Sequence, residues 1–213
     1  MHEIALLNSF IIRTSCRGAN TGIGKTLVSI GLADAARRSG VPLLYLKPAQ
    51  TGFPDDSDAR VVALAYGTHP VMGPHAAMLA PEVSFNHAHE EPVSRVKVMH
   101  AWSSPVSPHL AVSREGRPVS DRELLTSVSS ELIAFARRLE KERSTAAGGS
   151  SQKGIALLET AGGVASPAPS GELQVSLCIS SYFLARIILV SCYSRKITFG
   201  NLVKSIFALS LPS

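Results

Sequence analysis

The stretch Gly18-Ala-Asn-Thr-Gly-Ile-Gly-Lys-Thr26 decides the fold class of this 213-residue chain. It is a glycine-rich turn ending in Gly-Lys-Thr, and a segment with helical spacing of apolar residues follows it. Backbone N–H groups of such a turn point toward an anion, and the dipole of the following helix favours negative charge. The strict pattern is not met, because Ala19 replaces its first glycine. An ordinary glycine turn rarely places Gly-Lys-Thr at a helix start, so we interpret the stretch as the phosphate loop of a nucleotide site.

Strand and helix signals alternate on both sides of this loop. Phe10–Ile12 is β-prone, and Lys25–Ser39 has apolar residues at helical spacing up to a glycine stop at Gly40. Val41–Leu46 is a continuous apolar run, typical of a strand that is buried on both faces. Ser57–Tyr66 is a further predicted helix, whereas the rest of the stretch from residue 53 to 102 gives weak signals.

The second half of the chain continues the alternation. Ser120 and Glu123 form a capping box before a helix whose apolar face extends to Leu139. Gly154–Leu158 is another apolar run that predicts a buried strand. Strands of this kind that alternate with helices predict an α/β fold: a P-loop NTPase-type parallel sheet with helices on both faces.

Chemistry-bearing side chains follow the loop and the predicted strands. Lys25 would reach the β- and γ-phosphates of a nucleotide, and the hydroxyl of Thr26 would ligate Mg²⁺. Lys47 and Thr51 follow the second strand, at the sheet edge where α/β proteins bind ligands. Glu159 follows a later strand, where a carboxylate can serve Mg²⁺ directly or through water. Together these residues describe a site for ATP and Mg²⁺ with an additional lysine near the γ-phosphate.

The acidic cluster Asp55-Asp-Ser-Asp58 leaves two interpretations open. It is either part of the cation site or a solvated acidic turn, and on its own it favours neither. The histidines at positions 69, 75, 87, 89 and 100 have no metal-like spacing, and we expect structural or exposed roles for them. Trp102 is expected in the core.

Composition excludes several classes of protein. The chain is 45% hydrophobic and 17% charged, which excludes a collagen-like, coiled-coil or wholly disordered chain. Four of its basic residues and none of its acids follow Gln174, so the remainder holds 17 basic and 16 acidic residues and is nearly neutral. We therefore expect no nucleic-acid partner. The most apolar stretch, residues 177–193, has Arg186 near its centre, so we expect no membrane span.

Four ordered segments resemble the dethiobiotin synthetases, ATP-dependent enzymes that close the ureido ring of biotin. They are GANTGIGKT, KPAQTG with DSDA, SPHLAVSREGRPV at 107–119, and ETAGGVASPAPSG at 159–171. The form of the last segment is most similar to the synthetase half of the bifunctional plant and fungal enzymes. The resemblance covers residues 18–174. We expect residues 1–17 to be an atypical N-terminal segment and residues 175–213 an apolar, basic tail outside the family, which would leave the sheet incomplete at the C-terminus.

The resemblance implies a reaction and roles for individual residues. Carbon dioxide or bicarbonate carboxylates 7,8-diaminononanoate, ATP activates the carbamate, and the second amine closes the ring to dethiobiotin. Lys25 and Lys47 would be catalytic, Thr51 would contact the diamine, and Thr26, Asp58 and Glu159 would hold Mg²⁺. The ATP-binding set implied in this way is Gly22, Ile23, Gly24, Lys25, Thr26, Leu27, Asp58, Glu159, Thr160, Ala161 and Gly162.

The same resemblance implies a homodimer and a mitochondrial location. The first 17 residues carry Arg13 and Arg17 as their basic residues and do not predict a transit peptide, so the cytosol is the alternative. Two alternative functions stay open at this stage. One is a catalytically inactive truncated form or gene-model fragment that at most binds nucleotide, and the other is a partitioning-type P-loop ATPase.

Overall fold

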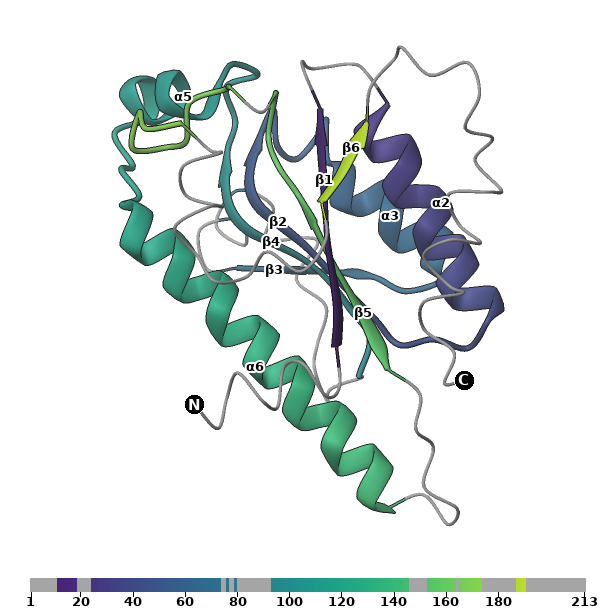
Figure 1. Ribbon diagram of the computed structural model, residues 1–213. Coiled ribbons are helices and arrows are strands. Elements are labelled where there is room, and N and C mark those ends of the chain that lie inside the picture. Colours follow the sequence, from purple (N-terminus) through teal and green to yellow (C-terminus); the bar gives the residue numbers. More distant parts are fainter. Residues whose placement is uncertain are drawn as a thin grey trace.

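A single sheet of six parallel strands organises the chain in this computed structural model, which describes residues 11–18, 24–73, 76, 79, 93–145, 153–163, 165–173 and 187–190 (Figure 1). The strand order is β3-β4-β2-β5-β1-β6. The strands are β1 (Ile11–Gly18), β2 (Leu43–Thr51), β3 (Pro70–Met72), β4 (Arg95–Trp102), β5 (Gly154–Glu159) and β6 (Ile187–Val190).

Helices cover both faces of this sheet, as the sequence predicts. Figure 1 shows α2 and α3 on one side and the long helix α6 on the other. The helices are α2 (Lys25–Arg38), α3 (Asp58–Tyr66), α5 (Pro108–Glu115) and α6 (Asp121–Thr145). The α/β fold with a parallel sheet is therefore confirmed.

Strict alternation along the central strands divides the core between the two faces. In β2, Leu43 and Tyr45 pack into the cluster that contains the buried residues of α2 and α3. Leu44 and Leu46 point the other way and pack with the apolar face of α6. Successive side chains of a strand point to opposite faces, so a strand segment that packs against helices on both sides is apolar at consecutive positions. This is why the run Val41–Leu46 shows no polar alternation.

The predicted helix boundaries agree with the structure to within a residue or two. α2 ends with its C-cap at Ser39, and Gly40 follows with a φ of 64°, which suits glycine at a helix stop. Before α6, the Ser120 hydroxyl accepts the Glu123 backbone N–H at 3.2 Å, the first half of the expected capping box. α6 extends to Thr145, slightly into the stretch that the sequence indicates as a linker.

The sequence gives no clear signal for β3, β4 and α5. β4 lies inside the sheet between β3 and β2, yet it carries Arg95, Lys97 and His100 among its apolar residues. Lys97 forms an ion pair with Glu131 of α6 at 2.5 Å, which explains how a central strand accommodates this charge. Trp102 at its end is buried, as expected, and its indole N–H donates to the Arg117 carbonyl at 3.3 Å.

Both ends of the described chain contribute strands. β1 lies between β5 and β6 and pairs with both in parallel, with Ile12 opposite Ile155 and Cys16 opposite Ile188. β1 is longer than the predicted strand Phe10–Ile12 and continues to Gly18. β6 comes from the stretch after residue 174 and forms the edge of the sheet beside β1.

Within the described residues, no helix combines the length and the apolar character that crossing a membrane requires.

The packing of α6 generates a stability prediction. Leu132 is fully buried between α6 and the sheet, so we expect Leu132→Ala to lower the free energy of unfolding by about 3 kcal/mol through lost burial and a cavity. Leu64 on α3 is 73% exposed and provides the matched control, since Leu64→Ala should change stability by less than about 0.5 kcal/mol. Urea unfolding measures both variants, and equal effects would contradict the assignment of the α6 face to the core.

Candidate functional site

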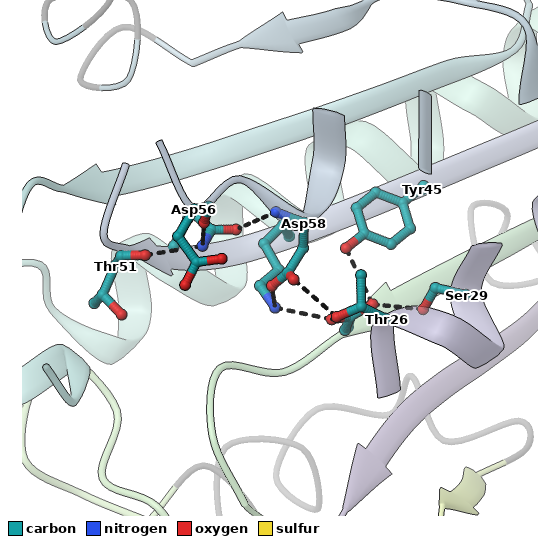
Figure 2. A network of polar contacts seen from close by, with 9 residues as sticks. Thr26, Ser29, Tyr45, Thr51, Asp56 and Asp58 are labelled. Atoms are coloured by element: carbon teal, nitrogen blue, oxygen red, sulfur yellow. Dashed lines mark hydrogen bonds and ion pairs between the residues drawn. The ribbon is translucent and has the colours of Figure 1, made fainter. Parts of the chain in front are cut away.

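Four predicted residues meet at the carboxyl edge of the sheet. Thr26 lies in the first turn of α2, Lys47 in β2, Asp58 at the start of α3, and Glu159 at the end of β5. β2 and β5 are neighbours with Leu46 opposite Leu158, so the next residues along each strand, Lys47 and Glu159, lie side by side. Figure 2 shows Thr26 and Asp58 within this polar network.

Glu159 is the centre of the network. Its carboxylate is fully buried and accepts hydrogen bonds from four side chains. Oε1 accepts from the Thr26 hydroxyl at 2.9 Å and from the Lys47 ammonium at 3.0 Å. Oε2 accepts from Ser29 at 2.5 Å and from the Tyr45 hydroxyl at 3.2 Å. A buried carboxylate must be compensated in this way, because losing water without new donors costs several kcal/mol.

Lys47 lies between two carboxylates. Its ammonium is 2.6 Å from Asp58 Oδ2 and 3.0 Å from Glu159 Oε1, and the side chain is 3% exposed. Burial opposes the positive charge, but the neighbouring carboxylates of Glu159 and Asp58 outweigh it and hold the pKa of Lys47 above its ordinary value of 10.5. Lys47 therefore stays charged at neutral pH although it is buried.

The Thr26 hydroxyl lies between the same two carboxylates. Its oxygen is 2.8 Å from Asp58 Oδ1 and 2.9 Å from Glu159 Oε1. A hydroxyl has one proton, so it can donate to only one of these two oxygens at a time. One hydroxyl oxygen and two carboxylate oxygens therefore lie close together at this point. No cluster of three or more His, Cys, Asp or Glu side chains suited to a metal occurs in the part of the chain that the structure describes.

The acidic cluster Asp55–Asp58 includes both a residue of the site and solvated residues, the two roles that its sequence leaves open. Asp58 joins the site, whereas the side chains of Asp55 and Asp56 are exposed. Gln50 determines this arrangement: its Nε2 donates to the Asp56 carbonyl at 2.7 Å and to the Thr51 carbonyl at 2.9 Å. Its Oε1 accepts the Asp58 backbone N–H at 3.3 Å. Gln50 thereby anchors the turn that delivers Asp58 to Lys47 and Thr26.

The other predicted residues surround this network less directly. Lys25 is buried at the start of α2, after Gly24, whose φ of 89° favours glycine. Leu27 points to solvent, and Thr51 is half-buried at the end of β2. Thr160, Ala161 and Gly162 follow β5 directly, while the predicted Gly22 and Ile23 lie outside the described residues.

Three residues of the network have no counterpart in the sequence prediction: Ser29, Tyr45 and Gln50. A serine within a helix and a tyrosine within an apolar strand are ordinary core or surface residues by type. The sequence signal that could have identified two of them is their spacing from predicted site residues. Ser29 is one helical turn after Thr26, and Tyr45 is two residues before Lys47, so each lies on the same face of its element as a site residue. Gln50 lies within the predicted KPAQTG segment, but its role depends on the fold of the following turn.

The pKa of Lys47 predicts how stability depends on pH. Because the pKa of Lys47 is raised on folding, its charged form stabilises the folded state, and this contribution is fully present below the unfolded pKa of 10.5. The contribution is lost as the pH rises through the higher pKa of the folded state. We expect Lys47→Met to be less stable than the wild type by about 3 kcal/mol at neutral pH, because two carboxylates lose their cation. The difference should persist to about pH 10 and shrink above it. Urea unfolding from pH 7 to 11 measures it, and a difference that vanishes below pH 9 would contradict the ion pairs.

Comparison with known proteins identifies the family of this chain. A family model described as an AAA domain matches residues 17–209. The chain is similar to the mitochondrial bifunctional dethiobiotin synthetase/7,8-diamino-pelargonic acid aminotransferase of Oryza sativa subsp. japonica, at 43% identity over 77% of this chain and 22% of that protein. The protein of that name from Arabidopsis thaliana is 37% identical over 75% of this chain and 22% of its own length.

A third relative carries the synthetase function alone in its name. The ATP-dependent dethiobiotin synthetase BioD of Haloferax mediterranei is 45% identical over 34% of this chain and 33% of its own length. The chain spans about a fifth of the two plant relatives. Because the family model covers most of the chain, the chain belongs to the AAA-domain family, and the relatives to which it is similar are named as dethiobiotin synthetases.

Proposed function

We propose that the chain catalyses the ATP-dependent carboxylation and ring closure of 7,8-diaminononanoate to dethiobiotin, in biotin biosynthesis. The observation that carries the proposal is the contact between Lys47, Asp58, Thr26 and Glu159 at the carboxyl edge of the sheet. Ligands of open parallel sheets bind at this edge. A buried cation beside a helix N-terminus is suited to a reaction in which phosphate and carbamate oxygens come together.

Lys25 and Lys47 are the proposed catalytic residues. Lys25 is in the first turn of α2, where the helix dipole and the lysine ammonium would both stabilise the negative charge of bound phosphates. Lys47 approaches from β2 and is kept protonated by its carboxylate neighbours, so it can stabilise negative charge that develops during transfer of the γ-phosphate. Thr51 ends the same strand, which supports its proposed contact with the diamine or its carbamate.

The proposed metal ligands are Thr26, Asp58 and Glu159. Mg²⁺ prefers oxygen ligands and in nucleotide sites uses one or two carboxylates together with phosphate oxygens and water. The Thr26 hydroxyl lies within hydrogen-bond distance of both the Asp58 and the Glu159 carboxylate, so the three side chains offer oxygen ligands that fit such an ion. When bound, Mg²⁺ would neutralise charge on the β- and γ-phosphates. Phosphate oxygens would supply the remaining ligands, since the described residues hold no complete side-chain cage.

The remaining details of the proposal rest on the resemblance to dethiobiotin synthetases. Backbone groups of 22–27 and 159–162 would bind the nucleotide, carbon dioxide or bicarbonate would be the carbon source, and the active assembly would be a homodimer. The catalytic domain would span residues 18–174. The plant relatives are named as mitochondrial, which supports a mitochondrial location over the cytosol.

Diamine-dependent ATP turnover tests the reaction. The purified chain, with ATP, Mg²⁺ and bicarbonate, should release ADP only when 7,8-diaminononanoate is present. Lys25→Ala and Lys47→Ala should each lower this rate by about 100-fold or more, because each removes a positioned cation from the developing charge. Lys141→Ala, on the exposed end of α6, is the matched control and should keep the wild-type rate.

Several results would contradict the proposal. ATP turnover without the diamine would favour an ATPase of the partitioning type. No turnover by a folded chain that binds ATP would indicate an inactive nucleotide-binding form. Circular dichroism of the lysine variants separates loss of chemistry from loss of fold.

Replacing one proposed metal ligand provides a separate prediction. Glu159→Gln keeps the shape of the side chain but removes its negative charge, so we expect the Mg²⁺ concentration for half-maximal turnover to rise by about tenfold or more. The exposed Glu140 of α6 gives the control variant Glu140→Gln, with unchanged dependence on Mg²⁺. An unchanged Mg²⁺ dependence in Glu159→Gln would exclude Glu159 as a ligand.

A further inference from the structure

The two oxygens of Glu159 have different partners. Oε1 faces Thr26 and Lys47, the residues that the proposed function places beside nucleotide and metal. Oε2 accepts hydrogen bonds from the hydroxyls of two other side chains, Ser29 at 2.5 Å and Tyr45 at 3.2 Å. Figure 2 shows Ser29 and Tyr45 directed to the same part of the network as Thr26.

The supporting hydroxyls come from the same elements as the functional groups. Ser29 follows Thr26 by three residues on α2, a spacing that puts both on one face of a helix. Tyr45 precedes Lys47 by two residues on β2, a spacing that puts both on one face of the sheet. Each element therefore sends one functional and one supporting side chain to the same carboxylate.

Neutral donors suit this supporting task. A cation at Oε2 would compete with Lys47 or a metal for the negative charge of the carboxylate, whereas hydroxyl groups restrain its orientation and leave that charge in place. Ser29 and Tyr45 are themselves fully buried, so they cannot exchange this acceptor for water. Hydrogen bonds around a ligating carboxylate affect metal affinity by about 10–100-fold when they are removed.

We infer that Ser29 and Tyr45 are positioning residues that hold Glu159 through Oε2 and so keep Oε1 directed to the site of Thr26 and Lys47. The inference deepens the proposed function and rests on it in one respect, the role of Glu159 as a metal ligand. It assigns no chemical step to either hydroxyl. Their effect is on how tightly Mg²⁺ and nucleotide bind together.

The test compares ADP affinity in Mg²⁺ with ADP affinity in EDTA, measured by calorimetry on the whole chain. The ratio of the two affinities reports the coupling between metal and nucleotide. We expect Ser29→Ala and Tyr45→Phe each to reduce this ratio by about tenfold, with ADP affinity in EDTA unchanged. In turnover assays the half-saturating Mg²⁺ concentration should rise, and excess Mg²⁺ should restore kcat.

Matched controls separate positioning from general stability. Tyr66→Phe removes a tyrosine hydroxyl that donates to the Val41 carbonyl at 3.1 Å, at the opposite end of α3 from Asp58. Ser129→Ala removes a hydroxyl that donates to the Leu125 carbonyl at 2.7 Å on α6. Both controls can shift the unfolding midpoint, but their affinity ratio should equal that of the wild type. Tyr45→Phe keeps the aromatic ring, so it carries the test if Ser29→Ala fails to fold.

The possible results distinguish this inference from the proposed function. An unchanged ratio in both variants, with Mg²⁺-dependent binding in the wild type, would overturn the positioning role and leave the synthetase reaction in place. A reduced ratio in a chain without diamine-dependent turnover would support the positioning role and overturn the reaction. A wild-type chain that binds ADP equally in Mg²⁺ and EDTA would overturn the metal site and the positioning role together.

Discussion

Burial of the Glu159 carboxylate is the constraint on which the arrangement of the site depends. A fully buried negative charge is costly unless several donors reach it, and here they come from α2 and β2. Displacing either element would remove two of the four donors. The network therefore fixes α2, β2 and β5 relative to one another, in the place where the proposed chemistry requires them.

The parallel sheet makes this meeting possible. β2 and β5 are hydrogen-bonded neighbours, so Lys47 and Glu159 reach the same edge although they are distant in sequence. α3 then adds Asp58, through a turn held by Gln50. Lys47 compensates two carboxylates and is in turn kept protonated by them, so the charges of the site support one another.

Particular residues show why some elements could be predicted from the sequence and others could not. Val41–Leu46 reveals a strand because both of its sides pack against helices. β4 escapes detection because Arg95, Lys97 and His100 interrupt its apolar pattern, and the partner that accommodates Lys97 is Glu131 of a helix much later in the chain. Ser29 and Tyr45 escape because their acceptor, Glu159, is more than one hundred residues away in sequence.

The sequence by itself determined the α/β class, the start of a helix at Lys25, and the lysine and acidic residues that follow the strands, because local spacing and residue type carry these properties. Tertiary structure decided which groups actually meet. It brought Asp58 and not Asp55 or Asp56 to Lys47, and it placed β4 inside the sheet. It also gave the two oxygens of Glu159 different partners. These outcomes depend on strand order, register and burial, which arise from contacts between distant segments rather than from any one of them.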